Sequence, residues 1–135
     1  MDDSKCMALK ADLSTQPEPQ IVSIERFFDG NDDLGSIGCN LIEHPGMEAF
    51  RSALNGLLKR PEIKAVYAQV AELDPGEDYW PFADTVFVVG RISTDDLRAA
   101  VATLQPDMVG DAAGFGIPSS ISERHDSPVL VIWWD

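Results

Sequence analysis

The sequence has few of the residues that build metal centres, disulfide frameworks or catalytic dyads. It contains only two cysteines and two histidines among 135 residues. Cys6 and Cys39 belong to no CxxC or Cys/His ligand pattern, and a single pair cannot make a disulfide framework. No apolar run is long enough to cross a bilayer, and the first residues lack the features of a signal peptide. We therefore expect a soluble, cytoplasmic protein with no cofactor.

Basic residues are scarce as well. The chain has 10 lysines and arginines against 23 aspartates and glutamates, so its formal net charge is −13. Because a phosphate backbone needs a basic surface, we expect no nucleic-acid partner, and nothing indicates a membrane partner. Five acids and no base lie between Arg26 and Arg51, and again between Lys64 and Arg91. These acids either keep the protein soluble or form a face for a basic protein partner.

The length fits one domain. Residues 1–19 are polar and lack sustained periodicity, so we predict a flexible N-terminal tail, or a short surface helix, before a single α+β domain over 20–135. The hydrophobic period predicts helices near 46–59 and 94–104, and strands near 63–73, 83–92 and 129–134. Two further short strands are expected over 21–28 and 36–42, and a long loop over 110–128.

This order of elements predicts an antiparallel or mixed sheet with two helices on one face. A ferredoxin-like plait with an extra N-terminal strand is one topology compatible with it. The predicted strands 83–92 and 129–134 are apolar on both faces, so Trp133 and Trp134 should point to opposite sides of the sheet. Cover within the chain, which we favour, predicts a monomer, whereas cover by a second copy predicts a homodimer.

Oxygen-bearing side chains alternate over Asp29–Asp33 as they do at the start of an EF-hand loop. The later positions do not fit, since Leu34 stands where glycine is needed and Asn40 where a bidentate glutamate is needed, so we expect an ordinary turn and no metal.

Cys39 and His44 are close enough in sequence for a thiol and its base, although a buried small residue explains Cys39 more simply. We assign no catalytic residue. A small enzyme or metal-dependent protein that uses His44, His125 and the Asp29–Asp33 loop is the alternative, provided that these groups share a pocket.

Aromatic residues and carboxylates are interleaved in the connection between two predicted strands. Such a segment offers contact area for basic or aromatic side chains, or else it caps the end of the core. The candidate partner surface consists of Glu77, Asp78, Tyr79, Trp80, Phe82 and Asp84.

Five short segments resemble the motifs of a family of small uncharacterised bacterial proteins. They are FFDGND at 27–32, GSIGCN at 35–40, HPG at 44–46, WPFADTV at 80–86 and WWD at 133–135. The resemblance extends from about residue 20 to the end and implies no activity. In size, acidity and α+β make-up the chain is also similar to bacterial immunity proteins, including the SMI1/KNR4-like group, an analogy of type that carries no residues across. We predict a non-enzymatic protein-binding module, with an immunity-type inhibitor as its most specific form.

Overall fold

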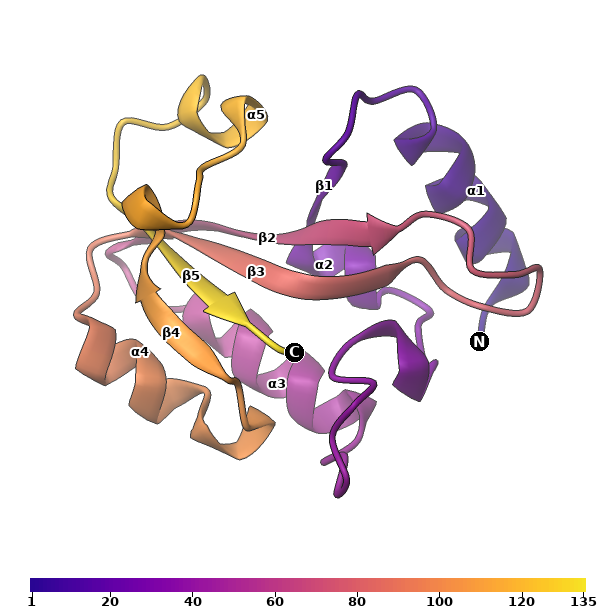
Figure 1. Cartoon of the computed structure of the whole chain (residues 1–135), viewed down its shortest axis with the longest axis horizontal. Helices are drawn as coiled ribbons and strands as arrows, with labels where there is room; N and C mark the ends of the chain where they lie inside the picture. The colour runs from indigo at the N-terminus through magenta and orange to yellow at the C-terminus, as the bar shows by residue number, and fades with distance from the viewer.

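The five strands of the protein form one antiparallel sheet in the order β1-β2-β3-β5-β4, and the computed structural model describes all of residues 1–135 (Figure 1). The strands are β1 (Ile21–Ser23), β2 (Ile63–Glu72), β3 (Phe82–Gly90), β4 (Met108–Asp111) and β5 (Val129–Trp133). The helices are α1 (Asp3–Leu13), α2 (Ile24–Phe28), α3 (Met47–Leu57), α4 (Thr94–Ala100) and α5 (Ser119–Ser122). The predicted α+β class is confirmed. None of the helices has the length and apolar character needed to cross a membrane.

The strongest periodic segments form the predicted elements. Helix α3 lies within 46–59 and buries Phe50, Leu54 and Leu57 along one stripe. The predicted helix 94–104 divides into α4 and a 3-10 turn, and the Ser93 hydroxyl caps its first turn by accepting a hydrogen bond from the Asp96 N–H at 3.0 Å. Strands β2, β3 and β5 match the three predicted strands to within two residues.

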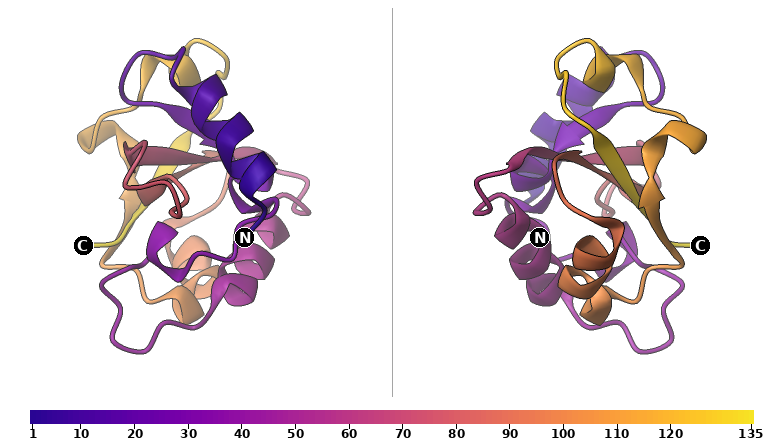
Figure 2. Two further views of the ribbon diagram at one scale, coloured as in Figure 1. Left: turned by 90° about the vertical axis from the view of Figure 1, so that its right-hand side faces the viewer. Right: turned by 90° about the vertical axis from the view of Figure 1, so that its left-hand side faces the viewer.

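The sheet separates two apolar layers. Figure 2 shows from the side that α3 and α4 lie on one face of the sheet and the segment with α5 on the other. The larger layer lies between the sheet and helices α1 to α4, and Trp134 is buried in it with its indole N–H donating to the Leu104 carbonyl at 2.8 Å. On the opposite face, Phe87 and Val131 pack under Ala112 and Ile121 from the segment that follows β4. Residues of the chain itself therefore cover Phe87 and Val131 on this face. Val131 and Ile132 belong to opposite layers, so Trp133 and Trp134 alternate as predicted.

The N-terminal segment differs from its prediction. Residues 3–13 form α1, so the flexible tail is wrong, and the helix named as its alternative is present. This helix is not confined to the surface, because Cys6, Leu9 and Leu13 are buried in the larger layer. The Asp2 carboxylate caps the helix by accepting a hydrogen bond from the Lys5 N–H at 3.1 Å. Cys6, Leu9 and Leu13 lie on the buried side of the helix, but Met7, Ala8 and Ala11 are also apolar, so the sequence gives little periodic signal.

Three other predicted segments also differ. The strand expected over 21–28 ends at Ser23, whose hydroxyl caps α2, and the strand expected over 36–42 is reduced to a single bridge between Ile37 and Ala83. The loop expected over 110–128 contains the end of β4 and helix α5. A ferredoxin-like plait would place the first strand between β3 and β5, whereas here β1 pairs with β2 and β3 pairs directly with β5. Residues of α1 and α2 join those of the two predicted helices in the larger layer.

Candidate functional site

The candidate partner surface lies on the β2–β3 turn, at one end of the sheet (Figure 1). The structure divides its residues between two roles. Trp80 is only 1% exposed and belongs to the larger core layer, whereas Tyr79 is 56% exposed and the neighbouring Glu77 and Asp78 are exposed too. Phe82 is half-buried at the start of β3. Trp80 therefore caps the core, whereas Tyr79 forms an outward aromatic surface on the same turn.

Asp84 belongs to β3 more than to the turn. Its backbone carbonyl accepts a hydrogen bond from the Trp134 N–H at 2.9 Å, and its half-buried carboxylate accepts one from the Thr85 hydroxyl at 2.9 Å. This residue therefore joins β3 to the end of β5 and contributes less to the outer surface.

Helix α1 holds the turn in place. The Lys10 ammonium donates to the Gly76 carbonyl at 2.8 Å and lies 3.0 Å from the Asp74 carboxylate. This ion pair lowers the pKa of Asp74. The Cys6 thiol, whose pKa is raised chiefly by burial, lies 3.6 Å from the Tyr79 carbonyl. The turn is thus anchored on both sides of its exposed carboxylates.

Glycine at position 76 lets the aromatic side chain lie against the turn. A Cβ added to Gly76 would lie 2.7 Å from Cδ2 of the Tyr79 ring. A side chain here would push the ring away from the backbone, so the position of Tyr79 depends on the absence of one.

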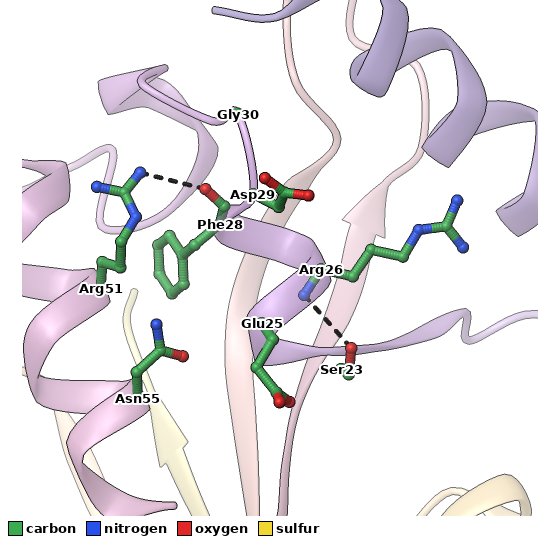
Figure 3. A pocket seen from close by; sticks show the side chains of 8 residues that line it. All are labelled: Ser23, Glu25, Arg26, Phe28, Asp29, Gly30, Arg51 and Asn55. Atoms are coloured by element: carbon green, nitrogen blue, oxygen red, sulfur yellow. Dashed lines mark hydrogen bonds between the residues drawn. The ribbon is translucent and has the colours of Figure 1, made fainter.

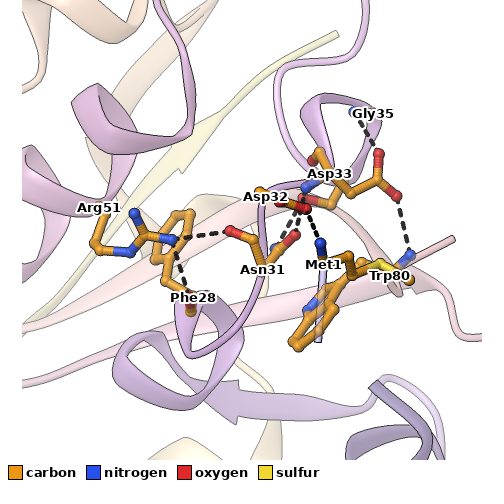
Figure 4. Close-up of polar contacts among 9 residues, drawn as sticks. Met1, Phe28, Asn31, Asp32, Asp33, Gly35, Arg51 and Trp80 are labelled. Carbon is orange, nitrogen blue, oxygen red and sulfur yellow. Dashed lines mark hydrogen bonds and ion pairs between the residues drawn. The ribbon is translucent and has the colours of Figure 1, made fainter. Parts of the chain in front are cut away.

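The loop after α2 packs against the β2–β3 turn and forms the other side of the site. The Asp33 carboxylate accepts hydrogen bonds from the Gly35 N–H at 2.9 Å and from the Trp80 N–H at 3.0 Å (Figure 4). Asn31 is buried; its amide donates to the Ser36 hydroxyl at 3.0 Å and its side-chain oxygen accepts from the Asp33 N–H at 2.9 Å. These oxygens cap backbone N–H groups, as expected of an Asx-rich turn.

A small hollow, the tip groove, lies between this loop and the β2–β3 turn. Its volume is about 270 Å³. The lining includes Asp33, Cys39, Glu72, Tyr79, Trp80 and Phe82. No lysine or arginine lines it, and neither of its carboxylates forms an ion pair. The indole N–H of Trp80 is buried without a hydrogen-bond partner.

The two histidines do not share a pocket. His44 contacts the Ile37 carbonyl through Nε2 at 2.9 Å and accepts a hydrogen bond from the Gly46 N–H through Nδ1 at 3.0 Å. His125 lies on the opposite face of the sheet, where Nε2 is 2.8 Å from the Tyr67 hydroxyl. The alternative function requires His44, His125 and the Asp29–Asp33 loop to share a pocket, and this prediction is wrong.

Cys39 also differs from its prediction. It is exposed at the tip groove, not a buried small residue. The neighbouring Gly38 has φ of +64°, and a Cβ there would lie 2.8 Å from Phe50 Cζ, so the close packing is made by the glycine. Both nitrogens of His44 are engaged by backbone groups, which leaves this ring no free position to act as a base for the thiol.

A wider polar groove of about 640 Å³ lies between α2 and α3 (Figure 3). The Arg51 guanidinium on one wall donates to the Phe28 carbonyl at 3.2 Å and the Asn31 carbonyl at 2.9 Å. Arg26 on the other wall is paired with Asp12. Both cations already hold backbone or side-chain oxygens, so this groove has no unpaired cationic group to offer a partner.

The motif segments found in the sequence meet around the tip groove and the adjoining end of the sheet. Ile37 bridges to Ala83, which joins GSIGCN to WPFADTV. The Asn40 amide donates to the Asp135 carbonyl at 2.9 Å, which joins GSIGCN to WWD. Sequence spacing gave no sign of this convergence, because contacting residues such as Asn40 and Asp135 are 95 positions apart.

The fold and site define a small α+β protein with one antiparallel sheet and a partly exposed aromatic, acidic turn. The chain belongs to the uncharacterised YfbO protein family, whose model matches residues 4–130. The uncharacterised protein YfbO of Escherichia coli (strain K12) is 25% identical over 101 residues, which cover 73% of this chain and 71% of that relative. No solved structure matches the chain. Membership of a small uncharacterised family agrees with the resemblance seen in the sequence, although the match begins in α1 and not near residue 20.

Proposed function

We propose that the protein is a cytoplasmic, non-enzymatic protein-binding module that docks a partner through the β2–β3 turn. The observation that carries the proposal is the Tyr79 side chain, 56% exposed on a turn that Lys10 and Asp33 hold from two sides. A large aromatic side chain on a backbone that is already ordered gives up little conformational entropy on binding, which favours contact with another protein.

Charge indicates the kind of partner. Glu77 and Asp78 precede Tyr79 in the turn, and Glu72 lines the tip groove with it. These three carboxylates form no ion pair, whereas Asp74 on the same turn is paired with Lys10. The formal net charge of −13 adds a negative field around the whole molecule. A partner with a basic surface would be attracted by this field and would supply the missing cations.

An immunity-type inhibitor is the most specific form of this proposal. Its support is the combination of small size, acidity and α+β make-up, together with an outward acidic turn that could cover a basic active site. In that form, the partner would be an enzyme whose activity falls when the complex forms.

Affinity capture from the native cell tests the proposal. Three baits are compared: the wild type, the triple variant Glu77→Gln/Asp78→Asn/Tyr79→Ala, and the control Glu123→Gln/Asp126→Asn/Phe115→Ala. The control removes the same charges and one aromatic ring from exposed positions outside the turn. We expect a partner that the wild type and the control retain and the turn variant loses.

Two results would contradict the proposal: equal capture by all three baits, or loss with the control alone. Circular dichroism of the three proteins shows whether the variants keep the fold.

A further inference from the structure

We propose that the tip groove receives the side chain of a lysine or arginine from the partner. This inference rests on the proposed function and states which group of the partner enters the site. It requires that the groove hold an apolar stem and a cationic head at once, because both side chains have this character.

The size and the aromatic lining suit a single long side chain. The volume of about 270 Å³ lies below the roughly 300 Å³ at which pockets for drug-sized ligands begin. Tyr79 and Phe82 supply aromatic surface against which methylene groups can pack. The exposed face of an aromatic ring also attracts a cation, and arginine most often makes this contact.

The carboxylates supply the other half of the fit. Asp33 is held in one orientation by two backbone N–H groups, and each carboxylate oxygen keeps capacity for a further donor. Glu72 lies on the rim at the end of β2 and forms no ion pair. An ammonium or guanidinium group in the groove would donate charge-assisted hydrogen bonds to these carboxylates and supply the cation that neither has in the free chain.

Other side chains would fit less well. An acidic side chain would be repelled by Asp33 and Glu72. A neutral apolar side chain would fill the groove but would remove water from two carboxylates without giving them a donor, which is costly. Charge complementarity therefore selects the cationic occupant.

Two titrations followed by NMR test the inference. The probes are N-acetyl-arginine amide and N-acetyl-citrulline amide, which have nearly the same shape but differ in charge. We expect saturable shifts of the Tyr79 and Trp80 signals with the arginine probe and about fivefold weaker binding of the citrulline probe. Glu72→Gln should weaken binding of the arginine probe by a similar factor, whereas Glu123→Gln should leave this binding unchanged.

The reaction rate of the Cys39 thiol with charged reagents measures the negative potential of the groove independently. Cys39 is exposed at the groove while Cys6 is buried, so small thiol reagents react at Cys39. The reagents are the cationic trimethylammonium-ethyl and the anionic sulfonato-ethyl methanethiosulfonate. We expect the ratio of the cationic to the anionic reaction rate at Cys39 to be at least about five times the ratio for free cysteine. Glu72→Gln should reduce this preference.

Equal binding of the two amides, or a reagent preference no greater than that of free cysteine, would overturn the inference. These results are distinguishable from failure of the proposed function. If capture still depends on the turn while the groove shows no preference for cations, only the occupant is wrong. If the groove prefers cations while capture does not depend on the turn, docking through the turn is wrong.

Discussion

Asp33 accepts a hydrogen bond from the backbone N–H of Trp80 at 3.0 Å, although the two residues are 47 positions apart in the chain. The same carboxylate caps Gly35, so one side chain fixes the loop after α2 and the β2–β3 turn against each other. The two walls of the tip groove are joined by this contact.

Replacement of Asp33 should therefore destabilise the protein. Asp33→Ala leaves the Trp80 and Gly35 N–H groups without their acceptor, and we expect the free energy of unfolding to fall by about 1–3 kcal/mol in urea titrations. Asp126→Ala removes an exposed carboxylate that forms no ion pair and should change it by less than about 0.5 kcal/mol. Equal effects of the two variants would show that the Asp33 contacts contribute nothing.

The anchoring of the turn by Lys10 should depend on pH. The pKa of Asp74 is lowered from 3.8 by Lys10, so the ion pair stabilises the fold above about pH 3.8 and this stabilisation is lost as pH falls through the folded-state pKa. Lys10→Met should lower the unfolding midpoint clearly at pH 6 and less at pH 2.5. Lys64→Met, which removes an exposed lysine without an ion pair, is the control. A difference between wild type and Lys10→Met that does not change with pH would contradict the role of the ion pair.

The separation of the histidines predicts additive mutations. His44→Ala leaves the Ile37 carbonyl and the Gly46 N–H unpaired, and we expect a loss of about 1–3 kcal/mol in unfolding free energy. His125→Ala removes the contact with the Tyr67 hydroxyl on the other face. The double variant should equal the sum of the single variants within about 0.5 kcal/mol, as measured in urea. A larger coupling would mean that the two histidines interact.

The two tryptophans at the end of β5 should differ in their contributions. Trp134 is 2% exposed and donates a hydrogen bond, so Trp134→Ser should cost about 3–5 kcal/mol, whereas Trp133→Ser at a half-buried position should cost about 1 kcal/mol. Because Ala112 and Ile121 cover the second face, we expect light scattering to give a monomer mass. A concentration-dependent dimer that Trp133→Ser disrupts would contradict cover within the chain.

The predictions from sequence held where one hydrophobic period dominated a segment. Phe50, Leu54 and Leu57 recur at helical spacing, and β3 and β5 are apolar runs with β-branched residues, so these elements were predicted nearly to their ends. The docking of α1 into the core was missed because Met7, Ala8 and Ala11 weaken the periodic signal of Cys6, Leu9 and Leu13, and because its position depends on contacts with the distant β2–β3 turn.

The site was only partly predictable for a similar reason. Tyr79 and Trp80 are neighbours in one acidic turn, and sequence could not show that one is exposed while the other is in the core. The opposite wall comes from Asp33 and Cys39, which the chain brings there through the bridge of Ile37 to Ala83. Such convergence is set by tertiary packing, which local periodicity does not record.

The central claim is that a protein partner docks on the β2–β3 turn. Hydrogen exchange of the captured complex, compared with the free protein, tests it most directly. We predict slower exchange over residues 73–82 and in the loop over 33–40, with no change over 112–125 on the opposite face of the sheet. Protection confined to 112–125, or to the groove between α2 and α3, with no change over 73–82, would contradict the account.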